Sequence, residues 1–357
     1  MRICVAGGGL AGTLLAWRLA ARPGVRIRLL TGVPGAGDAT AASGGLVRGF
    51  EPDPWNAAAA ARSLLELYTD DNLREMAGYR ETGSVYLPAA LTVTTQRIFD
   101  DLAAELPGSL SMLDTAEAAS RFGIAAPRGG VVIVERRAGF IRPDRLRRRI
   151  LALLPDLGVE VVPGSMHRLR QGPGAGLTYR TASGSARADV VVLATGPWTD
   201  RLLTAAGLAT TGLRTKAIQY SVHAADGLTP PSFVDEHSGL YGRPAEPGTL
   251  VLGLPTQRWG ADPGRCQVRE SEAREVADVA RLVLPRLRLV TPVRTVAAVD
   301  AYAPDGRLRL RAVPGPEGLF TFTGGSGGAA KTALAATATA ATELLGTAVP
   351  LSAGHRS

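Results

Sequence analysis

The first thirty residues show the clearest pattern of apolar runs and breaks. Residues 2–6 (RICVA) form an apolar run that predicts a buried strand, and residues 13–24 (TLLAWRLAARPG) predict a helix ended by Pro23 and Gly24. Residues 25–30 (VRIRLL) predict a second strand. The order indicates a β-strand–helix–β-strand unit, the building block of parallel sheets.

Glycines separate that first strand from its helix. Gly7, Gly9 and Gly12 match G-x-G-x-x-G directly after a strand and at the start of a helix, the context in which this motif binds dinucleotides. The first glycine allows the turn, the second lets the backbone approach a pyrophosphate, and the third lets helix and strand pack closely. Helix N–H groups then point at the phosphates. A purely structural glycine turn is the alternative interpretation.

One part of the dinucleotide pattern is missing. The second strand of such a unit ends in Asp or Glu, which binds the ribose hydroxyls, and here that position is Thr31. A threonine hydroxyl can still hydrogen-bond a ribose, but more weakly than a charged acceptor. We expect the cofactor to be held less tightly as a result.

Further elements follow along the chain. Residues 188–198 (ADVVVLATGPW) predict another parallel strand that runs into a glycine turn, and residues 146–162 predict an amphipathic helix and a short strand. Residues 83–93 and 239–256 predict antiparallel strands with Gly and Pro turns, and residues 329–346 predict a helix of small apolar residues. Nucleotide-binding pieces therefore lie at the start, middle and end of the chain, with a strand-rich region inserted twice.

Composition narrows the classes of protein. The 357 residues suggest two domains, and 45% hydrophobic with 20% charged residues is typical of a folded globular protein. Two cysteines make no disulfide framework, the four histidines show no metal-ligand spacing, and no apolar stretch reaches membrane-spanning length. We therefore expect a cytoplasmic protein without a metal or a membrane partner.

Two features of the basic residues bear on function, a cluster of arginines and the rarity of lysine. The net charge is +8, and the dense cluster Arg145, Arg147, Arg148 and Arg149 favours a solvated helix face over nucleic-acid binding, because no aromatic stacking pattern accompanies it. Among 40 basic residues only Lys216 and Lys331 are lysines. A compact ammonium inside the glycine-rich run at 324–334 suggests a site, and a chance survivor of an arginine-rich composition is the alternative.

Together the motifs resemble the D-amino-acid oxidase superfamily of flavoproteins, the group that contains glycine oxidase and monomeric sarcosine oxidase. The likeness covers nearly the whole chain and rests on segments that occur in the family's order: GGGLAG near the N-terminus, TAASGGLVRG at 40–49, GFIRPDRL at 139–146, VVLATGPW at 191–198, APDGRLRL at 303–310 and GLFTFTGGSGGAAKTAL at 318–334.

The resemblance implies an α/β fold in which a discontinuous Rossmann-like FAD-binding domain (1–80, 139–213 and 303–357) carries an antiparallel-sheet substrate domain (81–138 and 214–302). FAD would be bound without a covalent link, since no cysteine lies near the C-terminal glycine turn and no histidine near residues 40–49. The implied FAD contacts come from Gly7, Gly9, Leu10, Ala11, Gly12, Thr31, Thr40, Ala42, Ser43, Val161, Thr195, Gly196, Trp198, Gly325, Ser326, Gly327, Gly328, Ala329 and Lys331.

For the substrate, the resemblance implies a carboxylate clamp. Relatives similar to sarcosine oxidase carry G-x-S-G-x-x-x-K, matched here from Gly324 to Lys331, and an arginine after the second flavin-contacting loop, matched by Arg48. This pair would grip the carboxylate of a small amine substrate. Without the resemblance, Arg48 would be interpreted as a surface arginine. Tyr241 and Arg243 could line the pocket, and a structural role at a strand end fits them equally.

Two positions depart from the family. Glycine and D-amino-acid oxidases have an arginine five residues before the Asp of P-D-G, and here Asp300 stands there. The lysine with which relatives activate O2 falls on Val251, so Lys216 would have to supply that cation from another strand. If Lys216 does not, the enzyme would use another electron acceptor.

The expected activity is therefore oxidation of the C–N bond of a small amino or imino acid by hydride transfer to flavin N5. The products would be an imine and, after reoxidation by O2, hydrogen peroxide. The alternatives are a flavin-dependent dehydrogenase, isomerase or cyclase with another acceptor, or oxidation of an amino-acid-like group on modified tRNA. A nucleic-acid partner is not expected, since no extra nucleic-acid domain is present. The sequence gives no indication of an oligomeric state.

Overall fold

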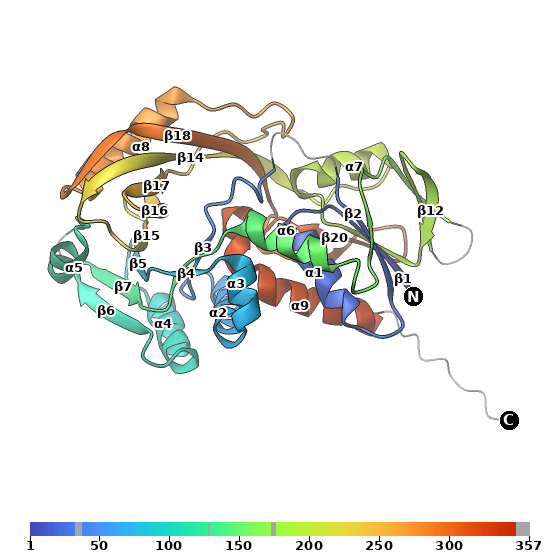
Figure 1. The fold of residues 1–357 in the computed structure, drawn as a ribbon, viewed down its shortest axis with the longest axis horizontal. Coiled ribbons are helices and arrows are strands. Elements are labelled where there is room, and N and C mark those ends of the chain that lie inside the picture. Colours follow the sequence, from blue (N-terminus) through green and yellow to red (C-terminus); the bar gives the residue numbers. More distant parts are fainter. Residues whose placement is uncertain (33–37, 128, 173–175, 348–357) are drawn as a thin grey trace.

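The computed structural model describes residues 1–32, 38–127, 129–172 and 176–347. Two large sheets dominate the molecule, one mostly parallel and one mostly antiparallel (Figure 1). This mixed α/β architecture confirms the fold class that the sequence predicts.

The first sheet is the parallel one, with strand order β19-β20-β13-β1-β2-β9. Only the β19–β20 pair is antiparallel. The central strand β1 has a run of apolar residues, Ile3 to Ala6, with almost no exposed surface, as expected of a parallel strand covered on both faces. The strands are β1 (Arg2–Ala6), β2 (Arg26–Leu30), β9 (Glu160–Val162), β13 (Val190–Leu193), β19 (Arg309–Ala312) and β20 (Leu319–Thr323).

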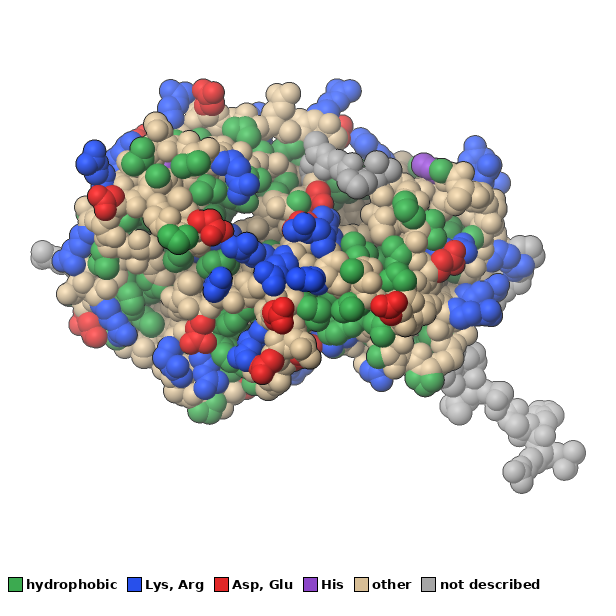
Figure 2. Space-filling model, viewed as in Figure 1, with side chains coloured by type: hydrophobic (Ala, Val, Ile, Leu, Met, Phe, Trp, Pro, Cys, Tyr) green, Lys and Arg blue, Asp and Glu red, His purple; other side chains and the backbone are tan. Residues whose placement is uncertain are grey.

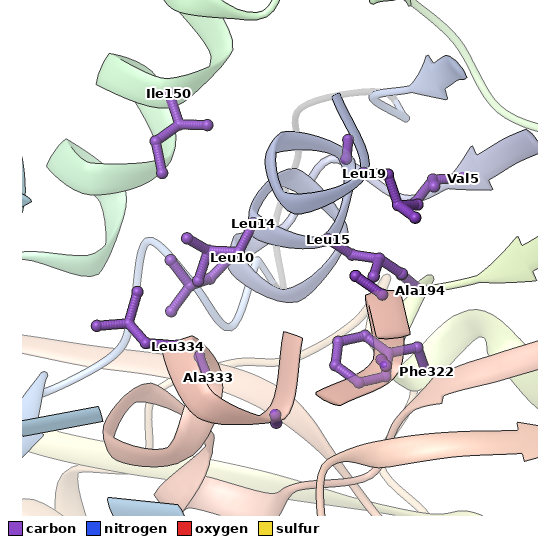
Figure 3. Close-up of a cluster of buried hydrophobic side chains, with 14 of the residues drawn as sticks. Val5, Leu10, Leu14, Leu15, Leu19, Ile150, Ala194, Phe322, Ala333 and Leu334 are labelled. Carbon is purple, nitrogen blue, oxygen red and sulfur yellow. The ribbon is translucent and has the colours of Figure 1, made fainter. Parts of the chain in front are cut away.

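Helices cover one face of this sheet, and a small antiparallel sheet covers the other. Leu14 of α1 lies in one apolar cluster with Ile150 of α6, Leu334 of α9 and Phe322 of β20 (Figure 3). The opposite face packs against the sheet β10-β11-β12 and α7 through a cluster that includes Tyr179. These elements are α1 (Leu10–Ala20), α6 (Pro143–Leu153), α7 (Thr199–Ala205), α9 (Ala329–Thr347), β10 (Arg168–Gln171), β11 (Leu177–Thr181) and β12 (Gly184–Ala188).

The second large sheet has eight strands in the order β18-β14-β17-β16-β15-β5-β7-β6. Its pairs are antiparallel except β15–β5, and α8 lies against its long strands β14 and β18 (Figure 1). The elements are β5 (Ser84–Leu87), β6 (Leu110–Asp114), β7 (Val131–Glu135), β14 (Arg214–Gly227), β15 (Ser232–Asp235), β16 (Tyr241–Pro244), β17 (Thr249–Gly253), β18 (Leu287–Tyr302), α4 (Val93–Glu105), α5 (Thr115–Phe122) and α8 (Glu270–Val283).

A short sheet lies where the chain passes between the two large ones (Figure 1). It consists of β3 (Leu46–Val47), β8 (Gly139–Phe140) and β4 (Arg80–Glu81), in that order. Helices α2 (Pro54–Thr69) and α3 (Asp71–Ala77) connect β3 to β4. The two-domain division proposed from the sequence stays a prediction, and residues 348–357 of its last segment lie outside the described residues.

The structure corrects one strand prediction. Residues 83–93 were expected to be extended, but β5 ends at Leu87 and Val93 begins α4. The Oγ1 of Thr92 accepts the backbone N–H of Thr95 at 3.0 Å. This N-cap starts α4 at Val93, and residues 88–92 form the loop between β5 and α4. Within the described residues, no helix is long and apolar enough to cross a membrane.

Candidate active site

A cavity of about 1460 Å³ extends from the parallel sheet to the eight-stranded sheet. At one end its wall contains Ala6 and Ala194, at the carboxyl ends of β1 and β13, which is where open parallel sheets bind ligands. At the other end its wall contains Lys216 of β14 and Asp300 of β18. One cavity therefore has room for a nucleotide-sized group beside a smaller molecule.

The glycine turn after β1 is closely packed on one side. Gly7 has φ +120°, and a Cβ added there would lie 2.3 Å from the carbonyl oxygen of Ala194. A Cβ on Gly12 would lie 2.0 Å from the oxygen of Gly7, so Gly12 lets α1 pack on the turn, and it is not part of the cavity wall. At Gly9 only Thr40 Oγ1 would lie within 4 Å, at 3.3 Å. Gly9 therefore faces the cavity, as close approach of a pyrophosphate requires.

The loop from 38 to 49 closes over this turn. Thr40 Oγ1 accepts the backbone N–H of Leu10 at 2.9 Å, which ties the loop to the first turn of α1. Asp38 accepts the N–H groups of Thr40 and Ala41 at 3.0 and 3.2 Å. Within this turn and loop the predicted cofactor contacts Gly7, Gly9, Leu10, Ala11, Thr40, Ala42 and Ser43 all line the cavity.

Thr31 lies at the end of β2 and also lines the cavity. Its Oγ1 is 3.5 Å from the carbonyl oxygen of Gly32, so the hydroxyl makes no strong internal hydrogen bond. The position is therefore open to a ribose, as the sequence suggests. Asp38, a carboxylate on the same wall, is already paired with Arg147 at 2.5 Å.

That ion pair corrects the interpretation of the arginine cluster on α6. The four arginines were expected on a solvated face, yet Arg147 and Arg148 line the cavity, and only Arg148 and Arg149 are exposed. Arg147 is half-buried, and Asp144 and Asp38 both pair with it. Figure 2 draws one face of the whole molecule and shows Lys and Arg side chains gathered near its middle, where Figure 1 places α6. Sequence reasoning missed this role, although Asp144 three residues before Arg147 was a visible signal of an ordered pair.

Val161 is not placed as expected. It lies inside β9, where it pairs with Leu29 of β2, and it does not line the cavity. Gly164 to His167, which follow the strand, line it instead. The backbone N–H and C=O groups of a strand form hydrogen bonds with the neighbouring strands. Backbone groups that are free to contact a ligand therefore come just after the end of the strand.

The remaining predicted cofactor contacts occupy two turns. One is the short helical turn at Gly196–Trp198 and the other is Ser326–Gly328 at the start of α9. Ser326 has φ +57°, a conformation rarely adopted by non-glycine residues, which fixes the second turn against the cavity. The predicted residues on this part of the wall are Thr195, Gly196, Trp198, Gly325, Ser326, Gly327, Gly328, Ala329 and Lys331.

Arg48 and Lys331 lie close together on the cavity wall, and both form an ion pair with a third residue. Arg48 Nη2 and Lys331 Nζ each lie 2.6 Å from the same oxygen, Oε1 of Glu51. Both cations line the cavity, whereas Glu51 does not. The structure brings the two cations close together, and it shows a carboxylate of the chain itself between them, which the sequence did not reveal.

The surroundings of Arg48 hold it rigidly. Its Nε donates to the carbonyl of Phe50 at 2.9 Å, and its guanidinium lies 4.9 Å from the centroid of the Tyr86 ring. Glu135, at the end of β7, accepts the N–H groups of Gly49 and Phe50 at 2.7 and 2.9 Å. A buried acid thus fixes the turn that follows Arg48.

Burial and ion pairing shift the pKa values of Glu51, Lys331 and Glu135 in opposite directions. Burial of the Glu51 carboxyl raises its pKa, but the adjacent Arg48 and Lys331 charges outweigh that effect and the pKa is lowered overall. Burial and the charge of Arg48 lower the pKa of Lys331, and Glu51 opposes them. Burial raises the pKa of Glu135, although two backbone N–H groups and Arg48 oppose that shift. Glu51 is thus the group that keeps both cations stable in a buried place.

The other predicted substrate residues separate into two groups. Lys216 lines the cavity, is buried, and places its ammonium 4.7 Å from the ring centroid of Trp259 and 5.7 Å from that of Tyr302. Tyr241 also lines the cavity. Arg243 does not, because its Nε donates to the carbonyl of Gly44 at 2.5 Å and its guanidinium lies on Phe140. The contacts of Arg243 support the structural alternative.

Comparison with known proteins identifies relatives of this chain. A family described as "DAO: FAD dependent oxidoreductase" matches residues 2–344. A glycine oxidase of Pseudomonas aeruginosa is 29% identical over 144 residues, which is 40% of this chain and 38% of that relative. The matched part therefore spans well under half of the curated relative.

Solved structures share the fold over nearly the whole chain. Glycine oxidase from Geobacillus kaustophilus superposes with a TM-score of 0.77 at 20% identity, covering 97% of this chain and 95% of that one. L-proline dehydrogenase from P. horikoshii superposes with a TM-score of 0.81 at 18% identity, covering 98% and 95%. The glycine turn, the open position at Gly9 and the cavity that continues from them fit a bound FAD.

The glycine turn allows its structural and cofactor roles to be separated. We expect Gly7→Ala to destabilise the FAD-free protein by about 2–4 kcal/mol, because the new methyl group meets the Ala194 carbonyl at a φ unfavourable for alanine. Gly9→Ala should cost less, about 1 kcal/mol, because Gly9 is the N-cap of α1 and its new methyl group meets only Thr40 Oγ1, yet it should weaken FAD binding. Urea unfolding and titration of FAD fluorescence measure the two effects, and wild-type FAD affinity in Gly9→Ala would contradict the assignment.

Proposed function

The chain belongs to the DAO family of FAD-dependent oxidoreductases, and on this basis we propose that it oxidises the C–N bond of a small amino or imino acid. The observation that carries the proposal is the continuous cavity, which joins the dinucleotide turn to a wall bearing Arg48, Lys331, Lys216 and Tyr241. A substrate on that wall would lie in the same space as the redox cofactor.

Bound FAD would supply the redox chemistry, accepting a hydride equivalent from the carbon beside the substrate nitrogen. The protein's contribution is orientation and electrostatics. The turn at Ser326–Gly328 places backbone N–H groups and the positive end of the α9 dipole at the cavity, where they favour negative charge. The reacting nitrogen must be neutral, since its lone pair assists loss of hydride from the neighbouring carbon.

We propose that Arg48 and Lys331 bind the substrate carboxylate from the cavity side. Their two positive charges share one negative charge, that of Glu51, so the trio carries a net charge of +1. One substrate carboxylate would balance it. Glu51 pairs with both cations but does not line the cavity, so it holds them from the protein side of the wall. The clamp is thereby ordered before substrate arrives, which reduces the entropy lost on binding.

The test of the function is anaerobic reduction of the FAD-loaded protein. We expect small amino or imino acids to bleach the flavin absorbance in the absence of O2 and to release the corresponding imine or its hydrolysis product. A screen of both enantiomers and of cyclic imino acids would define the range of substrates. FAD-loaded protein that no such acid bleaches would overturn the proposal.

Lys331→Met should weaken binding of a carboxylate substrate or inhibitor about 10- to 150-fold, because one charge-assisted hydrogen bond worth about 1.5–3 kcal/mol is lost. Glu51 keeps Arg48 as its partner in this variant, so the FAD content should be unchanged. Anaerobic titration of the flavin spectrum measures the dissociation constant. An unchanged dissociation constant would show that Lys331 serves Glu51 alone.

Lys216→Met is the variant to compare with Lys331→Met, since it removes the other lysine that lines the same cavity. Lys216 has a free ammonium over two aromatic rings, while Val251 is buried and lies off the cavity wall. We expect anaerobic flavin reduction to proceed normally and reoxidation by O2 to slow at least tenfold, because a cation stabilises the superoxide-like charge that develops on oxygen. Stopped-flow spectroscopy separates the two half-reactions. Normal reoxidation would exclude Lys216 as the oxygen-activating group.

A further inference from the structure

Most charged side chains on the cavity wall already have partners within the protein. Asp38 pairs with Arg147, and Arg48 and Lys331 share Glu51. Two further acids are satisfied by nearby donors. Asp235 accepts the His237 N–H and the Ser238 hydroxyl, and Glu236 accepts the Tyr86 hydroxyl and the Ala89 N–H.

Asp300 differs from these acids. It lies near the end of β18, lines the cavity, and accepts, from the part of the chain that the structure describes, only the backbone N–H of its neighbour Ala301, at 2.8 Å. No cation among the described residues forms an ion pair with it. Lys216 lies opposite in the strand pair, but its ammonium is turned over Trp259. Burial raises the pKa of Asp300 to about 6, and the Ala301 N–H only partly opposes that shift.

One aromatic side chain, that of Tyr302, lies near this carboxylate. Tyr220, Tyr241 and Tyr302 line the same cavity, and Tyr302 follows Asp300 by two residues on the same face of β18. The pKa of Tyr302 is raised to about 12, by burial and by the neighbouring negative charge of Asp300. A carboxylate beside an aromatic ring is a chemical environment that binds ammonium groups, through charge and through the ring face.

We infer that Asp300 binds a protonated nitrogen of the substrate, so that the preferred substrate carries a second amine. This inference rests on the proposed C–N oxidation. The reacting nitrogen has to be neutral, whereas an ionised Asp300 stabilises a protonated one, so the two roles require two nitrogens. The carboxylate clamp and Asp300 together would select diamino acids over neutral amino acids.

The inference is tested with a matched pair of ligands, DL-ornithine and DL-norleucine, which differ by an ammonium in place of a terminal methyl group. Binding to the FAD-loaded enzyme is followed anaerobically through the flavin spectrum, which reports affinity even without turnover. We expect ornithine to bind at least tenfold more tightly than norleucine. Asp300→Asn should abolish that preference while norleucine binds as before, and Asp300→Glu should retain part of it.

Asp226→Asn is the control, because Asp226 is an exposed acid at the far end of β14 and lies off the cavity wall. It should keep the wild-type preference. Equal affinities in the wild type, or an unchanged preference in Asp300→Asn, would overturn the inference. Bleaching by either ligand reports the oxidation itself, so equal affinities with bleaching reject the Asp300 site alone. An Asp300-dependent preference without bleaching supports the site and counts against oxidation of these compounds.

Discussion

The carboxylate of Glu51, shared by Arg48 and Lys331, is the interaction on which the geometry of the cavity depends. Two cations held close together in a buried place would repel each other and lose their hydration, and each would be destabilised. One acid between them removes both problems. It also joins the turn after β3 to the first turn of α9, segments that are distant in sequence. The wall facing the substrate is therefore fixed by an ion network rather than by apolar packing alone.

This arrangement explains why the cavity contains so many acids yet can still accept an anion. The wall acids Asp38, Asp235 and Glu236 are held by internal donors, and Glu51 lies behind the wall. Donors within the protein already bind these carboxylates. Their negative charges are therefore compensated internally and repel an anion in the cavity less. The cavity wall then presents a contrast of charge, positive at Arg48, Lys331 and Lys216 and negative at Asp300. Such a contrast orients a zwitterionic molecule before any chemistry takes place.

The sequence predicted the parts of the fold that depend on local pattern. The unit from β1 to β2, the strand β13 and the helix α9 are visible as apolar runs bounded by glycine, and the resemblance placed Arg48 beside Lys331. It did not predict that Glu51 joins the two cations, because the pairing of Glu51 with Lys331, 280 positions away, leaves no local signal, although the spacing of three residues between Arg48 and Glu51 is one. Arg147 was likewise misjudged despite the nearby Asp144, since only the tertiary fold turns its side chain toward Asp38. The end of β5 was missed although Pro88, which cannot donate to a ladder, follows Leu87, and the N-cap at Thr92 then starts α4.

The parallel sheet has a consequence for how the protein is made. β1 leaves the ribosome long before β20 and α9, which complete its sheet and help to cover α1. Leu14 and its apolar neighbours on α1 (Figure 3) therefore lack the cover of α9 until that helix has been synthesised. A nascent chain with such an exposed surface is prone to aggregate, and contacts this distant in sequence form slowly. The parallel sheet and its cover of helices can therefore be completed only after the chain has been synthesised through α9.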